Sequence, residues 1–434
     1  MQGSYWQRDA GWCDRWISAA IPREVDFAVI GGGFAGLMTA ICLREQNPDA
    51  RIVLLEAERV GFGASGRNAG FLSPLAAPVW LLGAERSPDQ AWGAKRINDE
   101  VHAIARWLGE HVPDCELAPA TLSLQAQSRV SDAALREFTR AVAIAGIEHQ
   151  LADSRARPGH LSLELTAYTL HPYKLVRGIA ELAERRGVVI RERARVREVE
   201  GLRAGGAHVH LDDRSSIAAT KVVACTNAYT SSLELREPVR ALTVHSFMTA
   251  TAPVDVEHLV RDGDFTVEMN PTQTYHRLHG NRIIYGGIDK VRAPDGGDFA
   301  VPDRDRARLV EQMAASFPRS ELAIDQAWSG RFHATPTGLP IIRHSERNHA
   351  LVLNVGYGGT GVALSLVCAR LAAAVASRGQ FSHSDDTRLM GLMHATRISV
   401  RDSVRAVARI ARGRGRAPRS RRRRARAPCR CHRR

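Results

Sequence analysis

Residues Val29 to Gly36 read VIGGGFAG, and three of their glycines, Gly31, Gly33 and Gly36, stand at the spacing GxGxxG. Each glycine has a physical task when such a string joins a strand to a helix. The first permits a tight turn, the second lets the backbone approach a pyrophosphate, and the third lets the helix pack closely on the strand. The free amide groups of the helix N-terminus then face the phosphates. The stretch therefore predicts a dinucleotide site.

The flanking sequence has the pattern that such a site requires. Residues 25–30 are apolar and typical of a strand, residues 37–44 follow as a helix, and residues 51–55 form a second strand. Glu56 ends that second strand, 20 residues after Gly36. An acid at this place accepts hydrogen bonds from the adenosine ribose. We therefore expect a strand–helix–strand unit of the Rossmann type.

A second string with GxGxxG spacing, Gly356 to Gly361, lies between a predicted strand over 350–355 and a predicted helix over 362–378. On its own it is compatible with a second nucleotide site, as in an NAD(P)H-dependent flavoprotein. No strand with a terminal acid follows it, because residues 382–386 are polar. We therefore predict that this loop and helix N-terminus contribute to the first site.

The composition is that of an ordinary folded protein, with 44% hydrophobic and 24% charged residues in a chain of 434. It excludes collagenous and coiled-coil chains and predicts one large or two interlocked domains. The best candidate for a membrane span, residues 362–376, is cut by Arg370, so no span is expected. No secretory signal is visible, and the cysteines of the body have no metal-ligand spacing. The sequence predicts a cytoplasmic protein without a metal site.

The positive charge of the chain is concentrated at its C-terminal end. Residues 397–434 contain sixteen arginines and one acid, Asp402, so this tail carries +15 and the rest of the chain −1, for a total of +14. A basic tail binds phosphates without sequence preference, which makes a nucleic-acid-associated protein one alternative. The body shows no reader motif, so we expect no specific nucleic-acid partner. The tail is expected to be a disordered or out-of-frame extension.

Five segments between residues 29 and 365 together resemble the superfamily of FAD-dependent D-amino acid oxidase, glycine oxidase and sarcosine oxidase. They are VIGGGFAG (29–36), LLEAERVGFGASGRNAG (54–70), ACTNAYT (224–230), TPTGLPII (335–342) and NVGYGGTGVALS (354–365). Within the superfamily, the opening SYW (4–6) and GASGRNAG (63–70) are most similar to the γ-glutamylputrescine oxidoreductase-like amine oxidases.

The resemblance implies an α/β (α+β) fold in which a mixed-sheet substrate domain covers the flavin. The other part is a Rossmann-like FAD-binding domain assembled from discontinuous segments. We expect an N-terminal arm (1–24), an FAD-binding domain (25–88, 160–232 and 331–380), a substrate or cap domain (89–159 and 233–330), and a disordered tail (397–434). Residues 89–146 show the spacing of Ala, Leu and Ile that is typical of helices.

The resemblance also implies which residues hold FAD. Gly31, Gly33 and Gly36 hold the pyrophosphate, Glu56 holds the ribose, and the backbone of Val196 meets the adenine. The other expected contacts come from the helix entry, a second flavin loop and the later glycine loop: Phe34, Ala35, Ser65, Gly66, Arg67, Asn68, Gly358, Gly359 and Gly361. Relatives with covalent flavin use a Cys before the TPTGLP-like string or a His in the second flavin loop. This chain has neither, so the FAD is expected to be non-covalent.

The activity implied by the resemblance is oxidation of a C–N bond of an amine or amino acid-like substrate. A hydride passes to the flavin, the product imine is hydrolysed, and oxygen or another acceptor takes the electrons. The sequence does not indicate the oligomeric state.

Candidates for substrate binding and catalysis come from a hairpin predicted over residues 274–285. Period-two alternation puts Tyr275 and Arg277 on one face of this hairpin and His276 on the other. Arg331 precedes the TPTGLP string and, like Arg277, has the planar guanidinium that binds a substrate anion with two hydrogen bonds. The catalytic candidates are Tyr275, Arg277 and Arg331, and the further candidates are His245 and His333.

Overall fold

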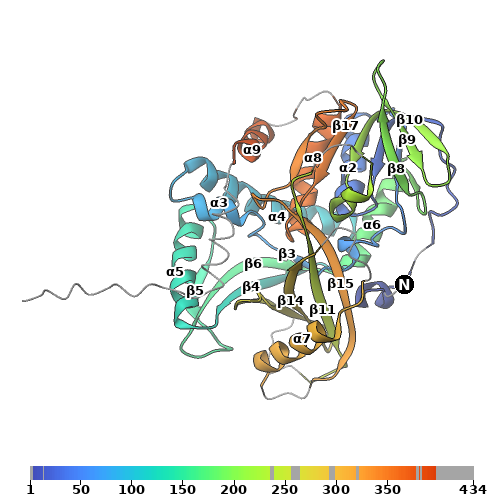
Figure 1. Ribbon diagram of the computed structural model, residues 1–434. Helices are drawn as coiled ribbons and strands as arrows, with labels where there is room; N and C mark the ends of the chain where they lie inside the picture. Colours follow the sequence, from blue (N-terminus) through green and yellow to red (C-terminus); the bar gives the residue numbers. More distant parts are fainter. Residues whose placement is uncertain are drawn as a thin grey trace, which may run out of the picture.

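The computed structural model shows two β-sheets with helices packed against them (Figure 1). The described residues are 3–12, 14–234, 239–255, 264–292, 299–318, 322–377, 381 and 384–396. The basic tail, 397–434, lies outside them, and so does the prediction of its disorder. The expected mixed α/β class is confirmed.

The first sheet contains the predicted strand–helix–strand unit. Its eight strands are β1 (Glu24–Ile30), β2 (Ile52–Leu55), β7 (Val189–Arg191), β8 (Val196–Gly201), β9 (Ala207–Leu211), β10 (Ser216–Ala224), β16 (Ile341–His344) and β17 (Leu351–Val355). The order is β16-β17-β10-β1-β2-β7, with β9 on β10 and β8 on β9. β1 pairs in parallel with β2 and β10, and β10 pairs in parallel with β17. The central strands are buried on both faces, which explains their continuous apolar sequences.

Three helices lie against the first sheet: α2 (Phe34–Gln46), α6 (Pro172–Arg185) and α8 (Gly361–Ser377). α2 and α8 pack on each other, although 314 residues separate their ends along the chain. A Cβ on Gly36 would come within 1.9 Å of the Gly31 carbonyl oxygen. Only glycine therefore allows α2 to begin so close to β1.

The second sheet is mainly antiparallel. Its nine strands are β3 (Phe71–Leu72), β4 (Ala118–Ala126), β5 (Gln150–Asp153), β6 (Leu161–Thr169), β11 (Leu242–Thr251), β12 (Phe265–Met269), β13 (Tyr275–His279), β14 (Arg282–Val291) and β15 (Ile324–Ala334). The order is β15-β11-β14-β13-β12-β4-β6-β3, with β5 on β6. One face packs on α7 (Asp303–Ser316) through a cluster that includes Phe247, Tyr285 and Met313. The other face lines the site described below.

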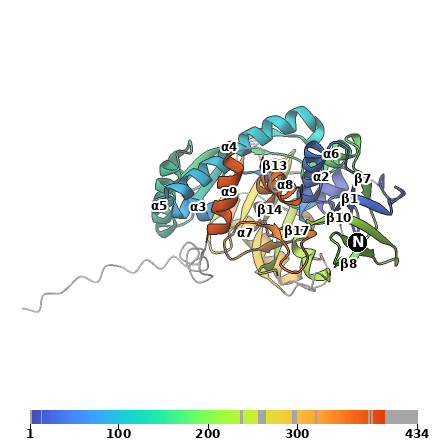
Figure 2. The same cartoon turned by 90° about the horizontal axis from the view of Figure 1, so that it is seen from above.

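The remaining helices are α1 (Tyr5–Asp9), α3 (Pro78–Gly83), α4 (Pro88–His111), α5 (Arg129–Ile144) and α9 (Ser384–Ala395). Seen from above, α9 lies beside α4 (Figure 2). Arg370 of α8 joins them, because its guanidinium pairs with Asp386 of α9 at 2.8 Å and with Glu100 of α4 at 3.1 Å. Short 3₁₀ turns occur at Ala64–Gly66, Pro113–Cys115 and Asn227–Ser232.

The predicted hairpin and most of the predicted elements are confirmed, with one correction. The helical pattern over 89–146 is interrupted by β4, which pairs with β6 and β12. Partner strands from distant sequence decide this conformation, and local spacing does not report them. β3 and β6 fall in ranges that we assigned to the FAD-binding domain, yet they pair in the second sheet. The domain boundaries stay a prediction.

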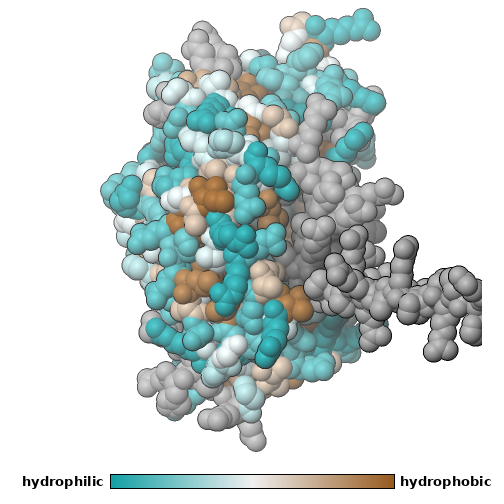
Figure 3. Space-filling view, turned by 90° about the vertical axis from the view of Figure 1, so that its left-hand side faces the viewer, coloured by the Kyte–Doolittle hydropathy of each residue, from teal (hydrophilic) through white to brown (hydrophobic). Residues whose placement is uncertain are grey.

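The face that carries α3 and α5 is largely hydrophilic, with separate hydrophobic patches (Figure 3). Its most exposed large apolar side chains include Leu82, Val130 and Ile144. Among the described residues, no helix has the length and apolarity needed to cross a membrane. The same residues contain no cluster of three or more His, Cys, Asp or Glu side chains suited to a metal ion.

Candidate active site

Two cavities open where the C-terminal ends of β1, β2 and β10 meet the second sheet. The first has a volume of about 440 Å³ and the second about 370 Å³. Part of their walls is common to both, namely Gly33, Ala64, Ser65, Cys225 and Asn227. A ligand longer than either cavity can therefore pass from one to the other.

The glycine turn forms one wall of the first cavity. Gly31 has a φ of +111°, and a Cβ there would lie 2.8 Å from the Cys225 carbonyl oxygen. Gly33 caps α2, and a Cβ there would lie 2.8 Å from the Ser65 hydroxyl oxygen. Ser65 accepts a hydrogen bond from the Phe34 amide at 3.0 Å. The predicted Gly31, Gly33 and Ser65 thus meet at the N-terminus of α2.

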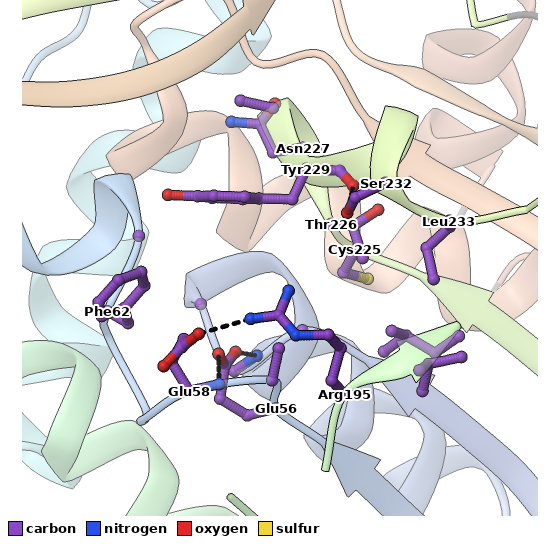
Figure 4. A pocket seen from close by; sticks show the side chains of 18 of the residues that line it. Glu56, Glu58, Phe62, Arg195, Cys225, Thr226, Asn227, Tyr229, Ser232 and Leu233 are labelled. Carbon is purple, nitrogen blue, oxygen red and sulfur yellow. Dashed lines mark hydrogen bonds and ion pairs between the residues drawn. The ribbon is translucent and has the colours of Figure 1, made fainter. Parts of the chain in front are cut away.

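Glu56 follows β2 and lines the first cavity. Its carboxylate accepts hydrogen bonds from the amides of Gly32 at 2.6 Å and Glu58 at 2.9 Å. Burial raises the pKa of Glu56 to about 7, and these two amides oppose the shift. Figure 4 shows Arg195 reaching across the cavity to Glu58, with Tyr229 on the opposite wall.

Val196 and Arg331 also line the first cavity. The Arg331 guanidinium lies 4.7 Å from the ring centroid of Phe299 and 5.4 Å from that of Tyr229. We expected Arg331 on the substrate side, but it does not line the second cavity. Arg331 instead shares the wall of the first cavity with the glycine turn.

The loop 61–70 separates the two cavities. Arg67 is almost fully buried, with its guanidinium 4.1 Å from the Phe299 ring centroid, and its Nε donates to the Phe62 carbonyl at 2.8 Å. Burial lowers the pKa of Arg67 to about 10. The Asn68 side chain donates to the carbonyls of Ala64 and Ser65. Arg67 and Asn68 line the second cavity, whereas Gly66 lines neither.

The N-terminal arm holds this loop from outside. Ser4 donates to the Gly66 carbonyl at 2.6 Å, Trp6 to the Asn68 carbonyl at 2.7 Å, and Gln7 to the Gly61 carbonyl at 2.9 Å. Trp6 is fully buried. A Cβ on Gly66 would come within 2.2 Å of the Gly61 carbonyl oxygen, so its glycine serves the tight loop.

The later glycine loop closes the second cavity. Gly358, Gly359 and Gly361 line it together with Phe34 and Ala35 of α2. The second GxGxxG string therefore faces the same space as the first string.

The two candidates from the hairpin, Tyr275 and Arg277, differ in whether they line a cavity. Tyr275 lines the second cavity, and its hydroxyl lies 3.0 Å from the Ser246 hydroxyl oxygen. Arg277 lies on the same face of β13, as alternation predicts, but it lines neither cavity. One of its guanidinium nitrogens donates to the carbonyls of Gly70 at 2.9 Å and Leu170 at 3.0 Å. Arg277 thus joins backbone segments and lies outside the walls of both cavities.

His245 and His333 are buried in neighbouring strands of the second sheet and line neither cavity. Burial lowers the pKa of both imidazoles to about 4, and the charges of Arg331 and Arg292 contribute at His245. Both are therefore neutral at pH 7.

Several site residues were not among our candidates. Asn227 lines both cavities, has a φ of +42°, and accepts hydrogen bonds from the amides of Gly356 at 3.2 Å and His333 at 3.4 Å. Asn227 and Tyr229 lie within ACTNAYT (224–230), one of the segments that carry the family resemblance. Asp289 and Ser246 line the second cavity without any local sequence signal.

Comparison with known proteins agrees with this architecture. The family model described as "FAD dependent oxidoreductase" matches residues 26–375. The chain belongs to this family of FAD-dependent oxidoreductases.

Relatives of this oxidoreductase bear out the resemblance. It is 27% identical over 393 residues to the probable oxidoreductase OrdL of Rhizobium meliloti (strain 1021), covering 83% of this chain and 87% of that protein. It is also 27% identical over 370 residues to gamma-glutamylputrescine oxidoreductase of Escherichia coli (strain K12), covering 80% and 82%. The structure of glycine oxidase from Geobacillus kaustophilus superposes with a TM-score of 0.70 at 19% identity, covering 87% and 100%.

The described residues fit FAD. Gly33 lines both cavities without a side chain, at the N-terminus of a helix that favours phosphate. In the first cavity the buried Tyr229 hydroxyl has no hydrogen-bond partner among the described protein atoms. A ligand with polar groups along its length satisfies both features.

Proposed function

We propose that this oxidoreductase binds FAD non-covalently and oxidises a C–N bond of an amine or amino acid-like substrate. The observation that carries the proposal is the pair of joined cavities, one beside the Rossmann glycines and one beneath the second sheet. The flavin, when bound, accepts the hydride that leaves the carbon next to nitrogen, and water then hydrolyses the imine. The names of its relatives, gamma-glutamylputrescine oxidoreductase and glycine oxidase, support nitrogen-bearing substrates.

In this proposal the first cavity holds the adenosine diphosphate part of the cofactor. Gly31, Gly33 and the start of α2 hold the pyrophosphate, Glu56 the ribose, and the backbone of Val196 the adenine. Arg331 supplies positive charge on the phosphate side, which revises the substrate role that we expected for it.

Non-covalent binding is supported by the composition of the cavity walls. Among the described residues that line the two cavities there is no histidine, and the one cysteine is Cys225. Burial raises the pKa of the Cys225 thiol to about 12. A thiol of this kind is a poor nucleophile at neutral pH.

The second cavity holds the flavin ring and the substrate. Its walls are mainly apolar, with Phe71, Met248 and Val267 beside a few polar groups. Such a wall excludes water from the reacting carbon. Tyr275 stays a proposed substrate contact, whereas we do not propose Arg277 as a substrate contact.

Anaerobic mixing with a panel of amines tests the proposal, because loss of flavin absorbance needs no assumption about the electron acceptor. We expect amines to bleach the flavin of the purified protein and hydroxy acids to leave it unchanged. Bleaching by hydroxy acids alone would refute the amine assignment. Denaturation should release all FAD from the polypeptide.

The predicted domain boundaries and the cytoplasmic location also stay proposals. The location is supported by Cys42, Cys115, Cys225 and Cys368, which are buried free thiols.

A further inference from the structure

The second cavity contains an acidic side chain that the proposed chemistry has not yet used. Among the described residues that line this cavity, the charged ones are Arg67 and Asp289. Arg67 lies on the side of the flavin loop, where it donates to the Phe62 carbonyl and packs on Phe299. Asp289 comes from β14 of the second sheet, on the side of Tyr275.

A β-bulge aims Asp289 into the cavity. His245 pairs with Lys290 and Phe247 with Gly287, so β14 has two residues, Ile288 and Asp289, opposite the single Ser246. The extra residue changes which side chain faces which side. Ile288 joins the apolar cluster with Phe247, and Asp289 lines the cavity with Ser246.

The bulge requires an unusual backbone conformation. Ile288 has a φ of +58°, which a β-branched residue rarely adopts. Without the bulge, alternation would turn Ile288 toward the cavity and Asp289 toward the apolar cluster. Strain of this kind persists where the surroundings enforce it, and it is enriched at functional sites.

Hydroxyl groups are arranged to support a carboxylate at this position. The Tyr275 hydroxyl lies 3.0 Å from the Ser246 hydroxyl oxygen, and both side chains line the cavity with Asp289. Because a carboxylate only accepts, a hydroxyl that bonds to it acts as the donor.

Near Asp289, the backbone of β14 leaves room for two side chains from neighbouring strands to meet. A Cβ on Gly286 would lie 2.1 Å from the Met248 sulfur and 2.7 Å from the Tyr275 ring. The glycine lets these two side chains meet over the strand, where the Tyr275 hydroxyl lies 3.3 Å from the sulfur. Asp289 itself is exposed beside this apolar wall, so a cation in solution can reach its carboxylate.

We infer that Asp289 is the specificity-determining group that binds the ammonium of the substrate, so that this oxidoreductase selects cationic amines. The bound ammonium loses a proton to water before the hydride leaves, because C–H cleavage needs the nitrogen lone pair. The inference deepens the proposed function and rests on it. It also replaces the arginine-based recognition of a substrate anion that the sequence suggested.

Binding of ligands that cannot react tests the inference on the FAD-loaded protein. tert-Butylammonium has no hydrogen on the carbon bonded to nitrogen, tert-butyl alcohol is its uncharged counterpart, and pivalate is an anion of similar shape. In calorimetric titration of the wild type, tert-butylammonium should bind most tightly, tert-butyl alcohol less tightly and pivalate most weakly. Absence of ammonium binding, or a preference for pivalate, would overturn the inference without any variant.

Asp289→Asn should weaken ammonium binding about 2- to 5-fold, the value of an ion pair at an exposed position, and leave alcohol binding unchanged. Asp303→Asn makes the same chemical change at an exposed position of α7 and should alter neither. Asp289→Glu retains the charge and should retain the preference for the cation. Flavin content reports whether each variant is folded.

The two proposals fail in different ways. If oxidisable amines bleach the wild-type flavin but Asp289→Asn still prefers ammonium, the role of Asp289 is wrong and the amine oxidation stands. If no amine bleaches the flavin while Asp289→Asn loses ammonium binding, the cation site stands and the reaction is wrong.

Discussion

Single atoms at the glycine turn decide whether a cofactor can enter. The Gly33 backbone, with a φ of −94°, is open to any residue, so the only obstacle to a side chain is the Ser65 hydroxyl 2.8 Å from the Cβ position. We expect Gly33→Ala to weaken FAD binding at least about tenfold, as overpacking of 1–3 kcal/mol implies. Equilibrium dialysis of FAD measures the effect.

A second variant separates the two consequences of the added methyl group. Removing the hydroxyl in Gly33→Ala/Ser65→Ala should restore the melting temperature but not FAD affinity, because we expect the Ser65 hydroxyl itself to contact FAD. Gly109→Ala, on α4 with nothing within 4 Å of the new atom, is the matched control. Full recovery of FAD affinity in the double variant would show that the phosphates lie elsewhere.

The role of Arg331 can also be tested by changing a single residue. Its place in the first cavity predicts that Arg331→Gln weakens FAD binding about tenfold through loss of a charged contact. At saturating FAD the KM for the amine should stay unchanged. An increase in KM with normal FAD affinity would instead return Arg331 to the substrate side. Arg308→Gln, exposed on α7, controls for the lost charge.

At the scale of elements, the short α1 illustrates how a surface arm acts on a buried loop. Its N-cap Ser4 and its residues Trp6 and Gln7 make three hydrogen bonds to loop 61–70, and Trp6 is fully enclosed. Trp6→Phe keeps an aromatic side chain but leaves a small cavity and removes the donor to the Asn68 carbonyl, at a cost of about 1 kcal/mol for the hydrogen bond alone. We expect FAD to dissociate about five times faster, as followed by the fluorescence of released FAD.

Trp92→Phe is the control for this prediction, because Trp92 lies on α4, away from the flavin loop, and stacks with Arg388. Equal rates of FAD release in wild type and Trp6→Phe would show that the loop keeps its shape without the arm.

Elements were predictable from sequence where the pattern was local. β1, α2 and β2 follow from apolar runs and glycine spacing, and the β13–β14 hairpin follows from its turn. The bulge at Ile288 was not predictable, because it exists only relative to the register of β11. For the same reason Asp289 was missed, and Arg277 was assigned a substrate role although alternation cannot show that it reaches the Gly70 carbonyl.

At the scale of the whole molecule, buried neutral histidines link stability to pH. The pKa of His333 is about 4 in the folded protein, below the ordinary 6.5, because burial disfavours the imidazolium. The unfolded chain therefore binds this proton more readily between pH 4 and 6.5. His333 contributes its full stability above pH 6.5, and the contribution is lost as the pH falls toward 4.

The change in unfolding free energy between pH 7 and pH 4.5 should therefore be smaller in His333→Gln than in wild type, by on the order of 2 kcal/mol. Urea titration followed by tryptophan fluorescence at each pH measures it. His349→Gln, at an exposed position, should follow the wild type. Parallel pH profiles of wild type and His333→Gln would contradict the assignment.

The shared wall of the two cavities also bears on how the protein is made. Gly33 and Gly361 line one space, yet more than three hundred residues separate them along the chain. At a synthesis rate of about 5–20 residues per second, roughly 20–70 s pass between the emergence of the first glycine and the last. During that time the nascent chain has a Rossmann turn without the loop that closes it. A nascent chain on a ribosome stalled before β17 should therefore not retain FAD. FAD should bind stably only after the residues up to Gly361 have been synthesised.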